Sequence, residues 1–580
     1  MAVPAALALA AALSAENSFF PLKDLKPGMH GIGKTVFSGE RIEDFQVEIL
    51  GVLENVGPKQ SLILARLSGG PLASTGVLQG MSGSPVYIDG KLLGAVASAF
   101  PFAKEPIAGI RPIQEMLRAA EAGREPVRKA SISLRDSDLT RALSKPEDTL
   151  AGDMRMVDIA TPVSFGGFTR GTIERFASQL RALGLEPRQG VSSGGRLDPH
   201  LGDRATLRPG SMISVELMTG DLSIGADGTV TYIDGNQVYA FGHRFLSLGP
   251  TELPFARSEV MTLLPNLASS FKISSPTQWM GTISQDRNTA ITGELGRRAR
   301  LAPVGISVAR AGHVIESYRM HMANDRFLAP FLTQIAVYSA IDSTERAIGA
   351  ASYAVRGEIE FQGNAPPIKL NNMYAGDANT AMQVSLSAAI PLAYVLQSGF
   401  SPLEIKQVSL NIESFDEKKQ LQIDQVTASP HEVRPGEKVQ LTAVLLGENG
   451  AEVTRRVDYA VPIGATPGPL YFTVADGNMT NLSEFRQIIG STPHSAEQLV
   501  ASVNKLRTNT KAYVRVWRME PNFQLEGDEF PDPPPSLALI LGSTQTTALQ
   551  TRNSKEAELE ISAGDAVISG VKTVQVEVKE

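Results

Sequence analysis

Alternating apolar and polar residues predict short β-strands along most of the chain. Phe45–Gly51 (FQVEILG) alternates as expected of a strand with one buried face, and Ser61–Leu67 (SLILARL) predicts another strand. Gly and Pro separate these short runs, which is typical of a β-barrel or sandwich. We therefore expect a mainly β protein. Further strands are predicted at residues 229–233, 353–361, 408–412, 421–426, 438–446, 471–474, 512–517 and 573–578.

Helical spacing is confined to a few segments. Residues 113–122 (IQEMLRAAEA) predict a short helix, and residues 172–183 (TIERFASQLRAL) predict a second that ends at Gly184. A third is expected at residues 496–506. The helices are too few to change the prediction of a mainly β chain.

Composition narrows the class of protein. The 580 residues carry a net charge of −7, which argues against nucleic acid as the main partner. The absence of cysteine excludes disulfides, thiolate catalysis and cysteine-based zinc sites. Seven histidines are present, and none has another potential metal ligand at a sequence spacing typical of a metal site. We therefore expect neither a metal nor a cofactor.

The first fifteen residues bear on the compartment. Residues 1–15 (MAVPAALALAAALSA) are apolar, with small residues near the end, as in a signal peptide, although no Lys or Arg precedes them. A short buried helix is the alternative. No later stretch is long and apolar enough to span a bilayer. We expect an extracytoplasmic protein that has no transmembrane segment after signal cleavage.

The most informative stretch is Gly80–Pro85 (GMSGSP), which we call the serine loop. Its glycines allow the backbone N–H groups near Ser82 to converge on one position, which is the geometry that an oxyanion hole needs. The apolar run after it leads into Asp89-Gly90, a strong hairpin signal. Because a strand comes next, the strand–turn–helix of a nucleophile elbow does not fit. A hairpin turn without chemistry is the alternative.

A second informative stretch ends in Gly242-His243. The predicted strand 229–233 turns at Asp234-Gly235 and returns through Val238–Gly242 to the histidine. Such an arrangement places an imidazole at a strand end, where a glycine allows close backbone approach.

Together these stretches resemble peptidase family S55, a group of trypsin-like serine peptidases. The serine loop reads like the family's Gly-x-Ser-Gly-x-Pro signature, and the resemblance extends over residues 19–128, including GKLLGAV at 90–96. Gly242-His243 resembles the segment that carries the family's histidine, and residues 281–287 and 291–295 resemble the family's stretch downstream of that histidine. The two halves stand in reverse order here, so the resemblance implies a permuted, trypsin-like two-barrel core.

The chain then divides into seven predicted segments. Residues 1–15 are a signal peptide, 16–128 the serine half, 129–205 a connector or insertion and 206–300 the histidine half. Residues 301–415 are a β-rich accessory region, 416–475 an Ig-like β-sandwich, and 476–580 a C-terminal α+β region.

The resemblance implies the roles of the site residues. Ser82 is the nucleophile, His243 the base, and the backbone N–H groups of Gly80 and Ser82 are the oxyanion donors. The third catalytic residue stays unknown, because Leu67 stands where the family carries its aspartate. Carboxylates in the histidine half that could replace it are Asp221, Asp234, Glu252 and Asp286.

His30 competes with His243 as the base. It precedes the serine, as in trypsin's own order, and Asp44 would complete a His-Asp-Ser sequence. The S55 family has no functional histidine at the position of His30, and two glycines close to it make a flexible turn. We therefore expect His243, and not His30, beside Ser82.

These inferences predict an exported serine endopeptidase that cleaves a protein or peptide substrate through an acyl-enzyme. The alternative is a catalytically degenerate protein of the same fold that serves as a cell-envelope binding or assembly module. Substrate preference and oligomeric state are left open.

Overall fold

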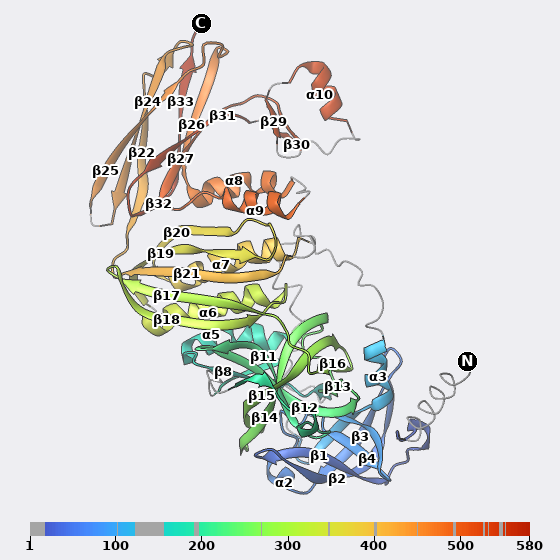
Figure 1. Cartoon of the computed structure of the whole chain (residues 1–580). Coiled ribbons are helices and arrows are strands. Elements are labelled where there is room, and N and C mark those ends of the chain that lie inside the picture. Colours follow the sequence, from blue (N-terminus) through green and yellow to red (C-terminus); the bar gives the residue numbers. More distant parts are fainter. Residues whose placement is uncertain are drawn as a thin grey trace. The chain divides into compact units, whose positions relative to one another are not determined.

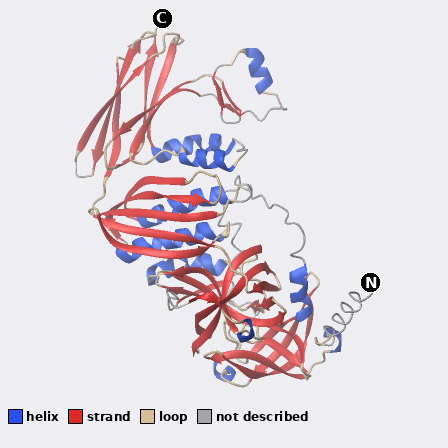
Figure 2. Ribbon diagram, in the orientation of Figure 1, coloured by secondary structure: helices blue, strands red, loops and turns tan. Residues whose placement is uncertain are grey.

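The computed structural model describes most of the chain in two compact units. The first comprises residues 1–304 and 318–339, and the second residues 305–317 and 340–580. Strands dominate both (Figure 2), so the prediction of a mainly β protein is confirmed. The predicted signal peptide lies outside the described residues. The residues that the structure describes are 18–100, 103–121, 156–190, 197–267, 269–345, 348–398, 403–448, 450–490, 495–525, 528–531, 533–543, 549–551 and 553–580.

The serine half folds into a closed barrel. Its strands follow the order β4-β1-β2-β3-β6-β5, and β4 pairs with β5 as well as with β1, which closes the sheet. The alternation seen in the sequence places Phe45, Val47 and Ile49 of β2 in the barrel core. Its elements, blue in Figure 1, are η1 (Leu22–Asp24), β1 (His30–Ser38), β2 (Arg41–Gly57), β3 (Gln60–Ser68), α2 (Leu72–Thr75), β4 (Pro85–Ile88), β5 (Lys91–Ala99), β6 (Ile107–Pro112) and α3 (Ile113–Glu121). The short strand β7 (Val157–Asp158), from the segment 129–205, pairs with β5.

The histidine half forms a second closed barrel in the same unit. Its order is β11-β14-β15-β16-β13-β12, and a further pairing of β11 with β12 closes it. Val215, for example, lies opposite Phe255 on one side and Ala226 on the other. The predicted two-barrel core is therefore confirmed. Its strands are β11 (Met212–Gly220), β12 (Ser223–Asp234), β13 (Gln237–Ala240), β14 (Gly249–Leu264), β15 (Phe271–Arg287) and β16 (Ala290–Leu295).

The described part of segment 129–205 extends the second barrel's sheet. Strand β8 pairs with β12, β9 pairs with β8, and β10 pairs with β15. The predicted helix here is α5, which is capped by Thr169 and packs Phe176 on Phe331 and Tyr338 of α6. This segment therefore does more than connect two halves. Its elements are β8 (Thr161–Gly166), α5 (Arg170–Ala182), β9 (Leu185–Gln189), β10 (Asp198–Leu201) and η3 (Arg204–Thr206); β18 (His313–Ala323) pairs with β11, and α6 spans Leu328–Thr344.

The second unit begins with a sheet in the order β20-β19-β21-β17, packed on α7. The strands predicted at residues 353–361 and 408–412 lie within β19 and β21. No helix in the described part of the chain is long and apolar enough to cross a bilayer. The elements are β17 (Leu301–Arg310, in this unit from Gly305), β19 (Ile348–Phe361), β20 (Ile368–Ala378), α7 (Thr380–Leu396) and β21 (Ile405–Phe415).

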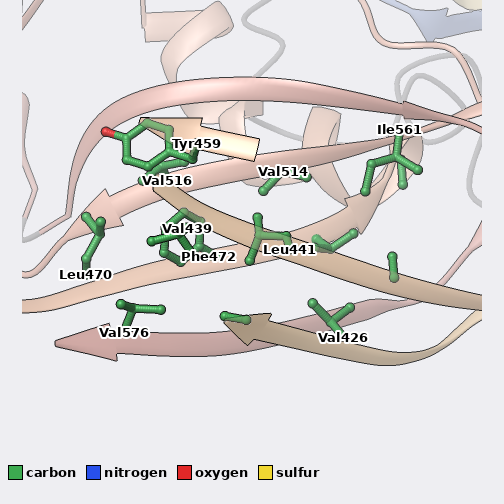
Figure 3. Close-up of a cluster of buried hydrophobic side chains, with 14 of the residues drawn as sticks. Val426, Val439, Leu441, Tyr459, Leu470, Phe472, Val514, Val516, Ile561 and Val576 are labelled. Carbon is green, nitrogen blue, oxygen red and sulfur yellow. The ribbon is translucent and has the colours of Figure 1, made fainter. Parts of the chain in front are cut away.

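The rest of this unit contains a β-sandwich that extends beyond the predicted residues 416–475. One sheet has the order β25-β24-β22-β32 and the other β23-β33-β26-β27-β31. The sandwich includes strands after residue 476 because the apolar face of β22 and β24 is buried only when a second sheet packs against it. Figure 3 shows this shared core, where Leu441 and Phe472 lie with Val514 and Val576.

The elements of this C-terminal part are β22 (Gln420–Ser429), β23 (Glu432–Val433), β24 (Lys438–Gly447), β25 (Glu452–Ala460), β26 (Gly468–Asp476), α8 (Gly477–Gly490), α9 (Ala496–Asn504), β27 (Lys511–Arg518), β28 (Asn522–Leu525), β29 (Asp528–Pro531), α10 (Pro535–Leu541), β30 (Leu549–Thr551), β31 (Ser554–Ser562), β32 (Val567–Ser569) and β33 (Val571–Val578).

Candidate active site

The serine loop is a tight turn between α2 and β4. Gly80 and Gly83 have φ values of +92° and +93°, a region that favours glycine. Ser84 N donates to Met81 O at 2.9 Å, and Gly83 N donates to Val96 O at 2.8 Å, which ties the turn to β5. The side chain of Ser82 is fully buried.

Strand β12 of the other barrel holds the carbonyls of this loop. Thr229 N donates to Ser82 O and Thr229 Oγ1 to Gly80 O, both at 2.9 Å. Thr231 Oγ1 donates to Gly83 O at 2.7 Å. No hydrogen bond among the described residues uses the N–H of Gly80 or of Ser82. These two N–H groups are the ones that the sequence predicts as oxyanion donors.

Glycines let the loop approach the second barrel closely. A Cβ on Gly83 would lie 2.0 Å from Thr229 O and 2.6 Å from Phe241 N. Across the same boundary, a Cβ on Gly242 would lie 3.2 Å from that of Ala95. The serine loop and the turn that carries His243 therefore pack directly on each other.

A distorted backbone presents His243. Phe241 and Gly242 both have φ of +70°, a conformation that costs energy for the buried Phe241 and is typical of functional sites. His243 Nδ1 lies 2.7 Å from Arg244 O, so Nδ1 is the donor and Nε2 of the neutral ring is an acceptor. Burial lowers the pKa of His243, which favours this neutral form, although the charge of Asp158 acts in the opposite direction.

Ser82 Oγ and His243 Nε2 are among the buried polar atoms of the described residues that have no hydrogen-bond partner. The two atoms therefore form no hydrogen bond with each other in this structure. One atom is a hydroxyl that can donate a proton, and the other is a ring nitrogen that can accept one.

Asp286 holds the loop that begins after the histidine. Its carboxylate accepts the N–H groups of Phe245 at 2.9 Å, Leu246 at 2.7 Å and Leu248 at 3.1 Å. Burial raises the pKa of Asp286, and the three N–H groups oppose that rise. Asp286 therefore fixes the backbone around His243 and does not hydrogen-bond to its ring.

The other three candidate acids have different surroundings. Asp221 accepts the N–H of Arg319 at 2.7 Å, and Glu252 accepts that of Arg300 at 3.0 Å. Asp234 is exposed in the turn between β12 and β13. Sequence reasoning missed Asp158 of β7, whose charge acts on His243 most strongly among the carboxylates. No sequence signal marked it, because it lies in the segment interpreted as a connector.

His30 is exposed at the start of β1, where it lies opposite Glu48 of β2. Asp44 forms an ion pair with Lys34, with 3.4 Å between Nζ and Oδ1. Since Ser82 Oγ has no hydrogen-bond partner, His30 does not accept its proton in this structure. Among the described residues, no three His, Asp or Glu side chains are grouped to hold a metal ion.

Two closed barrels with a buried serine and histidine at their boundary invite comparison with known proteins. Residues 21–117 match the family described as SpoIVB peptidase S55. The predicted resemblance is thereby confirmed for this S55 segment, which covers the first barrel from η1 into α3 and includes the serine loop. His243 lies outside the S55 segment, so the reversed order of the two halves stays a prediction. No curated protein and no solved structure matches the chain.

Similarity to an S55 peptidase makes peptide-bond hydrolysis the type of activity to expect of this segment. The substrate implied by such a family is a protein or a peptide.

Proposed function

We propose that the first unit is a serine endopeptidase with Ser82 as nucleophile and His243 as general base. The observation that carries this proposal is the pair of buried, unpartnered atoms, Ser82 Oγ and His243 Nε2, on segments that pack together. Buried polar atoms are rarely left without a partner in folded proteins, and those that are call for an explanation. Catalysis explains both atoms here, because the serine hydroxyl would pass its proton to the imidazole only during the reaction.

The geometry supports an acyl-enzyme route. His243 Nε2 takes the proton of Ser82 as Oγ attacks the carbonyl carbon of the scissile peptide bond. The negative charge that develops on the carbonyl oxygen is stabilised by the N–H groups of Gly80 and Ser82. The imidazolium then protonates the leaving amine, and water hydrolyses the ester with His243 again as base.

A backbone carbonyl takes the orienting place that an aspartate has in trypsin. Arg244 O fixes Nδ1 as the donor, so the ring needs no carboxylate to set its tautomer. We therefore propose a Ser–His dyad, with Asp286 acting through the backbone that it holds.

Ser82 is fully buried, so a substrate reaches it only when the surroundings separate. The same burial is the observation that favours the alternative, a degenerate peptidase that acts as a binding or assembly module. The two candidates differ in one property, the reactivity of the Ser82 hydroxyl.

A fluorophosphonate probe combined with peptide mapping tests this difference. The wild type should be labelled at Ser82 and should cleave casein, and Ser82→Ala should lose both activities. Ser74→Ala, which changes an exposed serine in nearby α2, should retain both. A folded wild-type protein that takes no label over prolonged incubation would favour the binding module.

We also propose export, on the basis of the apolar residues 1–15. N-terminal sequencing of the protein from the cell envelope or medium should then find a start near Glu16. An intact Met1 on a cytoplasmic protein would contradict this.

A further inference from the structure

A lysine lies fully inside the first unit, directly behind the serine loop. Lys272, at the start of β15, has only 2% of its surface exposed. Neither the S55 segment nor the proposed dyad gives it a role. Lysine is almost never fully buried without a partner, because removing an ammonium group from water is costly.

Backbone pairing places this lysine against the loop. Gln79 N donates to Ser270 O at 2.9 Å, and Lys272 N donates to Gln79 O at 3.2 Å. As a result, the stem of Lys272 covers Gly80, where a Cβ would lie 3.3 Å from Lys272 Cδ. The lysine stem therefore packs on one of the two residues proposed as oxyanion donors.

The amine reaches the other end of the same loop through hydroxyl groups. Lys272 Nζ donates to Thr35 Oγ1 at 2.7 Å, and Ser84 Oγ donates to the same oxygen at 3.0 Å. Thr35 and Ser84 are both fully buried. The chain Lys272–Thr35–Ser84 thus joins β15 of the second barrel to β1 and the serine loop of the first.

A buried carboxylate provides the opposite charge. Asp227 lies on β12, where alternate side chains share a face, so Asp227 lies on the same face as Thr229 and Thr231, which hold the loop carbonyls. Asp227 is the charged group that acts on Lys272, and the charge of Asp227 also acts on Glu216 of β11. Thr35 and the loop residues that face the lysine carry no charge.

We propose that Lys272 is a positioning residue for this peptidase site, holding the serine loop through Thr35 and Ser84 in the arrangement that Ser82 needs. This inference rests on the proposed function. Lys272 does not touch the reacting atoms, and it acts by fixing the loop on which the nucleophile and the oxyanion donors lie.

Titration of the lysine then regulates the site. Burial lowers the pKa of Lys272 to about 7, against the pull of Asp227. Because burial disfavours the ammonium, Lys272 packs behind the loop most favourably as the neutral amine, which still donates to Thr35 Oγ1. The packed arrangement of the loop is therefore more stable above that pH than below it. The rate of labelling at Ser82 should rise as the pH rises through about 7, above the range in which His243 titrates.

The test compares variants of the full-length protein by two measurements, the rate of fluorophosphonate labelling at Ser82 and hydrogen exchange in residues 80–85. Lys272→Met and Thr35→Val should each slow labelling and speed exchange by about tenfold, the effect of one net hydrogen bond. Thr35→Ser keeps the hydroxyl and should stay within about twofold of the wild type. Lys34→Met, which removes a partly exposed lysine from the same strand, β1, should leave both rates unchanged.

The pH profile separates positioning from simple support of the fold. The wild type should be labelled faster as the pH rises through about 7, and Lys272→Met should show a lower rate without that rise. A rise through pH 7 that persists in Lys272→Met would overturn the proposal, as would loop exchange unchanged in Thr35→Val. If Lys272→Met does not fold, the comparison of Thr35→Val with Thr35→Ser tests the proposal instead. A wild type that takes no label refutes the proposed function instead, and the exchange data still judge whether Lys272 holds the loop.

Discussion

At the residue scale, the absence of side chains at a few positions decides how the two barrels meet. Gly83 faces Thr229 O and Phe241 N across a gap with no room for a Cβ. Its φ of +93° adds a second reason for glycine, because an L side chain is strained there. These two effects combine at a position next to the proposed nucleophile.

Replacing Gly83 by alanine should therefore destabilise the first unit by about 2–5 kcal/mol, the combined cost of a strained φ and a close backbone contact. Urea unfolding measures this loss. Gly90→Ala is the matched control, since Gly90 also has positive φ (+73°) but no atom within 4 Å of a new Cβ. Equal losses in the two variants would contradict the close docking of the loop.

Asp286→Asn tests the carboxylate that holds the histidine loop. An amide retains one acceptor oxygen, so at least one of the three N–H groups that Asp286 accepts faces an NH2 group and loses its acceptor. We expect a loss of about 2–4 kcal/mol in unfolding free energy and slower labelling of Ser82. Asp234→Asn, in an exposed turn, should stay within about 0.5 kcal/mol of the wild type. A labelling rate equal to that of the wild type would exclude Asp286 as a support of His243.

At the scale of elements, strands β11, β12 and β15 bring three ionisable side chains into the interior. Burial raises the pKa of Glu216 to about 8 and that of Asp227 to about 6, and it lowers that of Lys272 to about 7. The ordinary values are 4.5, 3.8 and 10.5. The free energy of unfolding must therefore change with pH in opposite directions on the two sides of neutrality.

The signs depend on which state binds more protons. Between pH 4.5 and 8 the folded protein keeps a proton on Glu216 that the unfolded chain has lost, so stability falls as pH rises. Asp227 contributes in the same direction between 3.8 and 6. Between about 7 and 10.5 the unfolded chain keeps a proton that Lys272 has lost, so stability rises with pH. The contribution of this cluster is therefore lowest near pH 7–8.

Urea unfolding of the wild type and of Lys272→Met from pH 5 to 10 measures this contribution. Relative to Lys272→Met, the wild type should gain stability as the pH rises from 7 to 10, because the wild type alone has the lysine titration. A difference that is constant over this range would show that Lys272 titrates as an exposed lysine does.

At the scale of the whole molecule, the described chain divides into two compact units, and the sandwich in the second unit has a hydrophobic core of its own. The core of the sandwich centres on Phe472, which is fully buried and packs edge-on against Tyr459. The proposed site lies entirely within the first unit. Stability and labelling can therefore be perturbed in one unit at a time.

Phe472→Ala should destabilise the sandwich by about 3–5 kcal/mol, the usual cost of removing a buried phenylalanine side chain. Calorimetry should show one transition moved to lower temperature, while Ser82 is labelled at the wild-type rate. Ile463→Ala, which truncates an exposed side chain of the same sandwich, should move no transition. If labelling failed together with the sandwich, the units would not be independent.

The sequence by itself determined the fold class and the serine segment. Alternation at Phe45–Ile49 predicts a strand wherever it occurs, because side chains on a strand point to opposite faces. The glycines of the serine loop similarly marked a turn, since Gly80 and Gly83 adopt positive φ. Both signals are local, and so they could be interpreted before the structure was known.

Only the tertiary structure decided what surrounds the site. The pairings of β1 with β4 and of β11 with β14 join strands that lie far apart in the sequence, and no local pattern specifies them. The sandwich likewise takes strands from both sides of the boundary predicted at residue 475. Lys272 and Asp227 are ordinary charged residues in the sequence, which stand 45 positions apart (272 − 227). Their charges act on each other in the interior because long-range strand pairing brings β12 and β15 into one barrel.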